Sequence, residues 1–179
     1  SEEEIAERVE ELSAQGVDLQ SPRAWNAAYT FDVSLEAIVS LCYGAPLAVV
    51  PQAARTDRAR LRAFLQRHGA EVMDITPSQL EPLLGPGDVL PAPVLVVAGE
   101  AISTDLWRRL ARAPGPAWAQ HPPIVFNGYG PTEATVLVAA TRIQPELPCQ
   151  LGPAFPGLYF SIIDAAVRVL PPGPVGELY

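Results

Sequence analysis

The sequence predicts an α/β protein, with a mainly parallel sheet flanked by helices, followed by the start of an antiparallel β unit. Short apolar runs such as "VLVVAG" alternate with segments of helical periodicity, which is typical of βαβ units. After about residue 142 the helical period ends, and "GLYFSIID" and "VRVL" are joined by two alanines, as in antiparallel strands. We therefore expect an α/β subdomain in residues 1–145 and the incomplete beginning of a β subdomain in residues 146–179.

The first predicted element is an amphipathic N-terminal helix. Ser1 and Glu4 have the spacing of a capping box, and the helix is expected to stop at Gly16. Its apolar stripe consists of Ile5, Val9 and Leu12. The glutamates between them are interpreted as a solvated face and not as a binding tail.

Further helices are expected between the strands. Residues 35–43 carry their apolar side chains on one side of a helix, namely Leu35, Ile38, Leu41 and Cys42. Asp57 is expected to cap a second helix that ends before Gly69, and residues 103–112 form a third. "PSQLEPLL" predicts a short helix, and "PLAVVP", "VMDI", "VLVVAG" and "PIVFNGYG" predict strands.

Composition excludes several classes of protein. The chain has 179 residues, 49% of them hydrophobic, and a net charge of −8 with no lysine, so we expect no nucleic-acid partner. The most apolar stretch, residues 35–50, contains polar residues, glycine and proline, so no membrane span is expected. Cys42 and Cys149 form no C-x-x-C pair, and a reducing cytoplasm fits best. The missing initiator methionine suggests a processed or excised piece.

Three segments of unusual composition are expected at the carboxyl ends of strands: residues 30–34, 98–101 and 127–133. Open parallel sheets bind ligands at this edge, so the three segments predict a site. In "NGYGPTE", Gly128 and Gly130 allow close approach of a ligand and Tyr129 offers a ring for stacking. The other interpretation, a tight Gly-Pro turn with a surface glutamate, stays open.

Single polar residues also have two interpretations. Asp32 is either a helix cap or a counter-charge for a ligand ammonium, and Glu36 is either solvated or turned to the same side. Local rules favour the cap and the solvated position. Glu100 is read as a possible cap of the following helix. His68 and His121 lack a partner at metal-ligand spacing, so core or surface roles are expected.

Taken together, "FDVSLEA", "ITPSQL", "VVAGEA", "NGYGPTE" and "GELY" resemble the adenylation domains of nonribosomal peptide synthetases. These domains belong to the adenylate-forming superfamily, and the resemblance extends from about Arg23 to the end of the chain. It implies the second α/β subdomain of such an enzyme and the opening of its β-barrel. It also implies that an amino acid is activated as aminoacyl-AMP with ATP and Mg²⁺ and passed to a carrier protein beside neighbouring synthetase domains.

The resemblance implies roles for individual residues. For the nucleotide these are Tyr129 stacking on adenine, Asn127 bonding its edge, and Gly99, Glu100, Ala101 and Gly130 lining the pocket. Thr132 matches the phosphate contact and Glu133 the magnesium ligand, which makes them the two catalytic residues.

The same resemblance implies that Asp32 binds the α-ammonium of the amino acid. The other pocket positions are Val33, Glu36, Gln79, Val96, Ala98, Gly128, Val136 and Leu137. This wall is mostly apolar and open at Gly128 and Ala98, and Glu36 and Gln79 make one side polar. A side chain that donates hydrogen bonds or carries positive charge is expected. An acyl-CoA or aryl-acid ligase is disfavoured, because it has no use for a buried anion at Asp32.

The chain also departs from the family pattern. The lysine-containing phosphate loop, the aspartate that holds the ribose and the small subdomain with its catalytic lysine are absent, and the chain contains no lysine. We therefore expect the isolated chain not to adenylate. The alternative is a naturally truncated, non-catalytic domain with a structural or docking role in a megasynthase.

Overall fold

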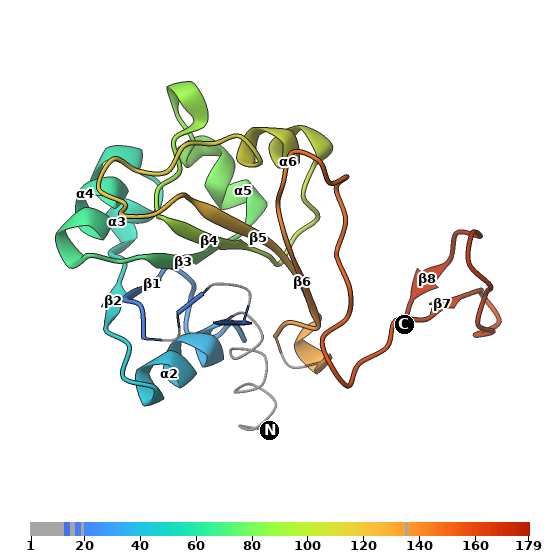
Figure 1. The fold of residues 1–179 in the computed structure, drawn as a ribbon. Coiled ribbons are helices and arrows are strands. Elements are labelled where there is room, and N and C mark those ends of the chain that lie inside the picture. Colours follow the sequence, from blue (N-terminus) through green and yellow to red (C-terminus); the bar gives the residue numbers. More distant parts are fainter. Residues whose placement is uncertain (1–12, 15–16, 19, 135) are drawn as a thin grey trace.

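The computed structural model describes residues 13–14, 17–18, 20–134 and 136–179. Within these residues a six-stranded sheet has the order β2-β1-β3-β4-β5-β6 (Figure 1). The strands are β1 Arg23–Trp25, β2 Leu47–Val49, β3 Val72–Ile75, β4 Val94–Val97, β5 Ile124–Tyr129 and β6 Ala139–Arg142. All neighbours pair in parallel except β5 and β6, which are antiparallel. The expected mainly parallel sheet is therefore confirmed.

Helices cover both faces of the sheet. One face carries α2, and the opposite face carries α3 to α6 (Figure 1). The helices are α2 Ser34–Cys42, α3 Gln52–Arg55, α4 Arg58–His68, α5 Pro77–Leu80 and α6 Thr104–Leu110, with short 3₁₀ turns η1 Glu81–Leu83, η2 Pro86–Asp88 and η3 Thr132–Ala134. The predicted N-terminal helix lies outside the described residues, apart from the helical Ser13 and Ala14.

The cap that the sequence predicts on α4 is present, and α6 begins at a serine cap, Ser103, that was not among the predictions. Asp57 Oδ1 accepts a hydrogen bond of 3.0 Å from the backbone N–H of Arg60, and α4 ends at Gly69 in a left-handed conformation. Ser103 Oγ accepts a hydrogen bond of 3.1 Å from the N–H of Leu106 at the start of α6. Local hydrogen bonds set these helix ends, and the sequence predicts them correctly for α4, whereas for α6 it suggested Glu100 as a possible cap.

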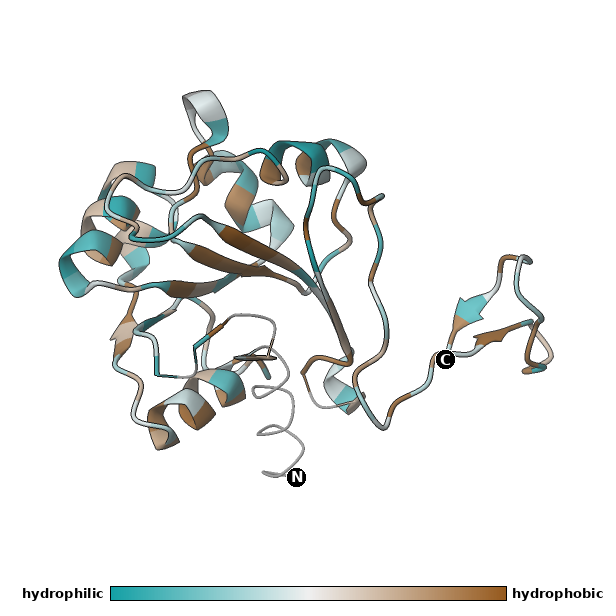
Figure 2. Cartoon of the chain, viewed as in Figure 1, coloured by the Kyte–Doolittle hydropathy of each residue, from teal (hydrophilic) through white to brown (hydrophobic). Residues whose placement is uncertain are grey.

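The core lies on both sides of the sheet. On the face of α4 and α6, fully buried side chains such as Leu61, Leu65 and Leu95 form the larger cluster. On the face of α2, Val96 and Phe126 belong to a second cluster. Strands buried on both faces are continuously apolar, and β3, β4 and β5 are largely hydrophobic in Figure 2.

The orientation of α2 differs from the expectation given by its periodicity. Its apolar side faces outward, with Leu35, Ile38 and Leu41 exposed by 39%, 46% and 48%. The residues that α2 buries are Ser34, Glu36, Ala37 and Ser40. The expectation that Glu36 is solvated is therefore wrong. Periodicity identifies residues that share a side, but the packing of the sheet decides which side is buried.

The segment before α2 also differs from expectation. Residues 30–34 do not follow the end of a strand, because β1 already ends at Trp25 and turns occupy residues 29–33. Asp32 is therefore placed by the turn that starts α2. The carboxyl edge of the sheet does not fix its position directly.

The C-terminal part contains β7 Ile162–Ile163 and β8 Glu177–Leu178, which pair in antiparallel fashion. The two short strands lie apart from the α/β unit in Figure 1. The preceding chain stays on the α/β unit, because the N–H of Phe155 donates a 2.8 Å hydrogen bond to the carbonyl of Val138. The predicted partner of this segment, "VRVL", meets β7 only at the isolated antiparallel bridge between Ile163 and Val169, and the strand that pairs with β7 is β8. The described residues form a two-stranded antiparallel sheet here and no barrel. The division near residue 145 stays a prediction.

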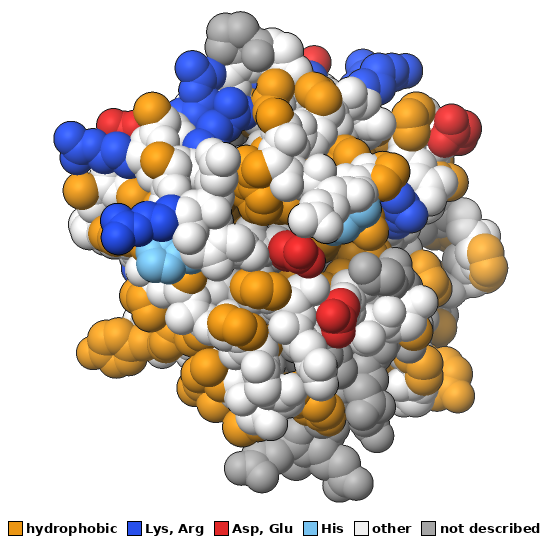
Figure 3. Space-filling model, turned by 60° about the vertical axis from the view of Figure 1, so that its left-hand side comes forward, with side chains coloured by type: hydrophobic (Ala, Val, Ile, Leu, Met, Phe, Trp, Pro, Cys, Tyr) orange, Lys and Arg blue, Asp and Glu red, His pale blue; other side chains and the backbone are white. Residues whose placement is uncertain are grey.

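The surface is mixed in character. On the face drawn in Figure 3, arginine side chains lie in small groups, with hydrophobic and uncharged side chains between them. Among the described helices, none has both the length and the apolar composition needed to cross a bilayer.

The core and α2 give a paired prediction for stability. Leu65→Ala, at a position with 0% exposure, is expected to lower the free energy of unfolding by about 2–5 kcal/mol because it leaves a cavity. Leu41→Ala, on the exposed side of α2, is expected to change it by less than about 1 kcal/mol. Urea denaturation of both variants measures the difference. Equal losses would contradict the observed orientation of α2.

Candidate functional site

Two adjoining cavities lie at the carboxyl ends of β3, β4 and β5. The first has a volume of about 480 Å³ and is bounded by α2; we call it the Asp32 cavity. The second has a volume of about 410 Å³, and we call it the Tyr129 cavity. They share Gly99, Glu100 and Gly130, so a ligand that occupies both passes these residues. A site at this edge agrees with the general position of ligands in open parallel sheets.

The structure brings eight of the nine expected substrate residues into the wall of the Asp32 cavity. These are Asp32, Val33, Glu36, Gln79, Val96, Ala98, Val136 and Leu137. Gly128 lines the Tyr129 cavity instead. The expected opening at Gly128 is filled, because a Cβ built there would lie 3.0 Å from Leu137 Cδ2 and 3.2 Å from Ala98 Cβ.

All six residues expected to contact the nucleotide line the Tyr129 cavity, namely Gly99, Glu100, Ala101, Asn127, Tyr129 and Gly130. Sequence analysis missed Ile102 and residues 149–151, which complete its wall. Residues 149–151 belong to the chain that returns past β5 after β6, and no local pattern marks them. Their position in the wall of the Tyr129 cavity depends on the tertiary path of the segment after β6.

Asn127 and Tyr129 project from β5 with defined neighbours. Asn127 is 3% exposed, and its Nδ2 donates a 2.9 Å hydrogen bond to the carbonyl of Gln150. Because Nδ2 is engaged in this bond, Oδ1 is the atom of the amide that can accept a hydrogen bond from a ligand. The exocyclic amine of a purine is a donor of this kind. The ring of Tyr129 meets Phe160 edge to face, with centroids 6.3 Å apart. This contact fixes one edge of the tyrosine ring beside the cavity.

Asp32 connects two segments that are far apart in sequence. Thr132 Oγ1 donates a 2.6 Å hydrogen bond to Asp32 Oδ2, and the N–H of Val33 donates to Oδ1 at 2.9 Å. The N-cap residue of α2 is Val33, without a side-chain cap, so Asp32 does not cap the helix as local rules favoured. A carboxylate at the wall of a cavity, held by a hydroxyl, can bind a ligand ammonium.

A buried charge network lies behind the Asp32 cavity. Arg23 Nη1 is 2.6 Å from Asp74 Oδ2 and 3.8 Å from Glu36 Oε2. Glu36 is 1% exposed, and neither of its oxygens has a hydrogen-bond partner within the described chain. Burial, and after it the charge of Asp74, raises the pKa of Glu36 to about 8, although Arg23 opposes the shift.

Glu100 has a different partner from the one expected. Ser103 caps the following helix α6, so Glu100 is not needed there. Its carboxylate accepts hydrogen bonds from the N–H of Ser78 at 3.0 Å and from Ser78 Oγ at 2.7 Å. These bonds hold the pKa of Glu100 below its usual value. Glu100 thereby ties the loop after β4 to the start of α5.

The remaining expected polar residues lie outside the cavities or at their rim. Thr132 lines the Asp32 cavity, whereas Glu133 in η3 is exposed and lines neither cavity. The described residues include no group of three or more His, Cys, Asp or Glu side chains placed to hold a metal. His68 packs against Phe64, and His121 contacts the carbonyl of Pro122.

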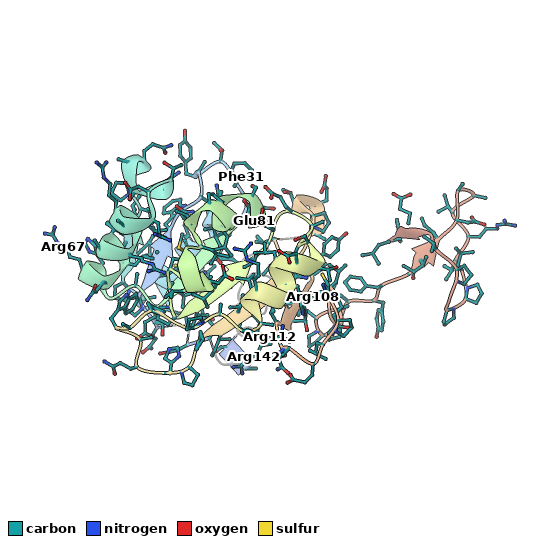
Figure 4. The ribbon with its side chains drawn as sticks, turned by 90° about the horizontal axis from the view of Figure 1, so that it is seen from above. Phe31, Arg67, Glu81, Arg108, Arg112 and Arg142 are labelled. Carbon is teal, nitrogen blue, oxygen red and sulfur yellow. The ribbon has the colours of Figure 1, made fainter. Side chains whose placement is uncertain are left out.

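Of the arginines within the described ranges, none lines the Asp32 cavity. In Figure 4, Arg67, Arg108, Arg112 and Arg142 lie on the outer surface of the α/β unit, and all four are exposed. Phe31, labelled in the same view, is 65% exposed and belongs to the cavity wall.

The backbone is tight where the two cavities meet. A Cβ at Gly130 would lie 2.2 Å from the carbonyl oxygen of Val136 and 2.7 Å from Leu137 Cα. Val136 has φ 66, a left-handed conformation that is costly for a β-branched residue. The contact of Gly130 with residues 136–137 therefore shapes the wall shared by both cavities.

Sequence analysis missed Arg23 and Asp74 as site residues. Both are charged residues inside apolar strands, and such residues are almost never buried unless they are paired. That signal is present in "RAW" and "VMDI". The partner of each charge is set by the pairing of β1 with β3, which the sequence does not specify.

The raised pKa of Glu36 predicts a dependence of stability on pH. The folded state keeps the proton above the unfolded value of 4.5, so this contribution to stability is complete below that pH and is lost as pH rises through about 8. Glu36→Gln removes the titrating group. The free energy of unfolding of the variant, minus that of the original protein, is expected to increase on the order of 4 kcal/mol as the pH rises from about 5 to about 9. Denaturant unfolding at several pH values measures this gain, and parallel pH profiles would contradict it.

Comparison with known proteins identifies the family. Residues 11–179 match the AMP-binding enzyme family. The chain is 34% identical over 159 residues to the AMB antimetabolite synthetase AmbE of Pseudomonas aeruginosa, covering 86% of this chain and 7% of AmbE. It is 32% identical over 164 residues to surfactin synthase subunit 1 of Bacillus subtilis, covering 86% of this chain and 4% of that subunit.

Solved structures agree with this assignment. The Vibrio cholerae adenylation domain AlmE, in complex with glycyl-adenosine-5'-phosphate, superposes with a TM-score of 0.72 at 26% identity, covering 96% of this chain and 34% of AlmE. A four-domain nonribosomal peptide synthetase bound to AMP and glycine superposes with a TM-score of 0.77 at 26% identity, covering 97% of this chain and 13% of the synthetase. The chain thus spans well under half the length of each of these relatives. It belongs to the AMP-binding enzyme family, as part of an adenylation domain of the kind found in nonribosomal peptide synthetases.

Proposed function

We propose that this chain supplies the amino-acid pocket and the adenine side of the ATP pocket of an amino-acid-activating domain. The domain joins the carboxylate of an amino acid to the α-phosphate of ATP and releases pyrophosphate. The aminoacyl group then passes to the thiol of a carrier protein. The observation that carries the proposal is the pair of adjoining cavities, which share Gly99, Glu100 and Gly130. An aminoacyl adenylate has two unlike halves and needs two such cavities.

In the proposed mechanism, Asp32 binds the α-ammonium of the amino acid. A carboxylate held by Thr132 and the N–H of Val33 is preorganised for this pairing. The ammonium competes with Thr132 for Asp32 Oδ2, so its arrival releases the threonine hydroxyl. Thr132 then donates a hydrogen bond to a phosphate oxygen. Amino-acid binding and the phosphate contact are thereby linked through one hydroxyl group.

ATP fits the chemistry of the Tyr129 cavity. Its volume of about 410 Å³ and its mixture of backbone, aromatic and amide groups suit a purine nucleoside. Asn127 Oδ1 accepts from the adenine amine and Tyr129 packs on the ring. Bound ATP supplies the α-phosphate that the amino-acid carboxylate attacks.

Mg²⁺ fits here only as an ion that is bound jointly by the protein and by the phosphates of ATP. The ion is often bound by one or two carboxylates together with substrate phosphates, and Glu133 offers one exposed carboxylate. Glu133 lies one residue beyond Thr132, so a metal held there would neighbour the proposed phosphate contact. The remaining ligands would come from phosphate oxygens and water.

Two relatives support the carrier-protein and amino-acid parts of the proposal. The structure called PA1221 is a synthetase protein that contains adenylation and PCP domains, with a TM-score of 0.71 at 23% identity. AlmE is described in complex with glycyl-adenosine-5'-phosphate. Each statement concerns the relative, and the proposal extends it to this chain.

The test is amino-acid-dependent exchange of pyrophosphate into ATP by the full-length protein that contains this chain. Exchange with at least one amino acid is expected, and its complete absence with intact ATP binding would favour the non-catalytic alternative. The 179-residue chain by itself is expected to give no exchange. It contains no lysine to neutralise the charge that develops on the α-phosphate. Exchange by the isolated chain would refute this part.

A further inference from the structure

The wall of the Asp32 cavity is rich in carboxyl groups. Its described lining includes Asp32, Glu36, Asp74 and Glu100, and includes no arginine, lysine or histidine. Asp32 accepts a hydrogen bond from Thr132, and Glu100 accepts two from Ser78. Glu36 and Asp74 have Arg23 as their ion-pair partner, and Arg23 does not line the cavity.

Arg23 balances only one of these two carboxylates. Its Nη1 is within hydrogen-bond distance of Asp74, at 2.6 Å, whereas the 3.8 Å to Glu36 is too long for a hydrogen bond. Both oxygens of Glu36 and Oδ1 of Asp74 are buried without a hydrogen-bond partner in the described chain. When both carboxyls are ionised, one negative charge and three acceptor atoms stay uncompensated. Buried groups of this kind are costly unless a partner arrives.

The residues that line the Asp32 cavity become more buried from Thr132 at its rim to Glu36. Thr132 is exposed, Asp32 is half-buried and Glu36 is 1% exposed. Asp32 lies in the turn before α2 and Glu36 in the first turn of the helix, and both line the same cavity, so both can contact one ligand. An amino acid held by its ammonium at Asp32 therefore directs its side chain toward Glu36.

We propose that the Asp32 cavity selects an amino acid whose side chain ends in a cation, an ammonium or guanidinium group, that donates hydrogen bonds to Glu36. The selection rests on the proposed amino-acid activation. Such a cation supplies several N–H donors and the missing positive charge. A neutral amide side chain satisfies acceptors but leaves the charge unbalanced, and an aliphatic side chain does neither.

Binding of such a side chain has a protonation signature. In the empty cavity the pKa of Glu36 is raised to about 8 by burial, so the carboxyl holds its proton near neutral pH. A cation beside Glu36 favours the carboxylate and lowers this pKa. The proton leaves Glu36 for the buffer as the cation binds. A neutral side chain of the same length causes no such release.

The first experiment compares amino acids in pyrophosphate exchange by the full-length protein. Lysine, ornithine and arginine are tested against norleucine, which matches lysine without the ammonium, and against glutamine. The best cationic amino acid is expected to exceed norleucine in kcat/KM by about tenfold or more. Exchange that prefers norleucine or glutamine would overturn the inference alone. No exchange with any amino acid would overturn the proposed function and the inference with it.

The second experiment uses Glu36→Gln, with Glu146→Gln as a matched control at an exposed carboxylate outside the cavity. Titration calorimetry in buffers of different ionisation enthalpy counts the protons released when the preferred cationic amino acid binds near neutral pH. The original protein and the control are expected to release up to about one proton. Glu36→Gln is expected to release none and to lower the ratio of kcat/KM for that amino acid to kcat/KM for norleucine by about tenfold or more. Equal losses for both amino acids would show a structural role and overturn the inference.

Discussion

Asp32→Ala is expected to lower kcat/KM for amino-acid-dependent pyrophosphate exchange by about 10²- to 10⁴-fold. Removing one partner of a desolvated charge pair costs about 3–5 kcal/mol, because the remaining charge stays unpaired. In the proposed site the unpaired charge is the α-ammonium of the substrate. Steady-state exchange kinetics of the full-length protein measure the effect.

Two further variants show where the loss arises. Asp105→Ala removes an exposed carboxylate from the first turn of α6 and is expected to leave exchange unchanged. Thr132→Val keeps the charge of Asp32 but removes the hydroxyl bound to it, and it is expected to lower kcat more than amino-acid affinity. If Asp32→Ala retains normal exchange, Asp32 does not hold the ammonium.

Gly130→Ala is expected to lower the free energy of unfolding by about 2–4 kcal/mol and to abolish binding at both cavities. The added Cβ would lie 2.2 Å from the carbonyl oxygen of Val136 and 2.7 Å from Leu137 Cα. Both are main-chain atoms, so a change of rotamer cannot relieve the clash. A shift of residues 136–137 would alter the Asp32 cavity, which they line, and a shift of Gly130 would alter both cavities. Urea denaturation and calorimetric binding of ATP measure the two effects.

Gly115→Ala is the matched control. Its Cβ would lie 3.4 Å from Pro123 Cβ, an ordinary contact, and its backbone is not in the left-handed region. This substitution is expected to be neutral or to stabilise by up to about 1 kcal/mol, since it reduces the freedom of the unfolded chain. Equal stability of the two variants would show that the wall at Gly130 yields more easily than its geometry indicates.

The elements that sequence predicted well are those fixed by short-range interactions. Asp57 caps α4 through its first turn, and Gly69 ends α4 in a left-handed conformation that glycine, unlike most other residues, adopts without penalty. The apolar run of β4 is buried on both faces, so its pattern is unambiguous. The residues expected to bind the nucleotide lie at the carboxyl ends of β4 and β5 or directly after them, and therefore meet at one edge of the sheet.

The errors concern α2 and the charges packed beneath it. Local rules favoured a solvated Glu36 and a capping Asp32, because an acidic residue near a helix start usually has these roles. In the structure Glu36 is 1% exposed and Asp32 binds Thr132. Both outcomes depend on segments far away in sequence, and a single sequence without its relatives carries no signal for such pairings.

The sequence by itself determined the alternation of strands and helices, the helix ends, and the identity of the loops that surround the site. These features follow from periodicity, capping and backbone freedom, which act over a few residues. Only the tertiary structure decided that α2 turns its polar side inward, that Arg23 bonds to Asp74 with Glu36 further away, and that Leu137 fills the space at Gly128. These features depend on which surfaces the folded sheet brings into contact, because the free energy of burying a charge is set by its neighbours and not by its own residue type.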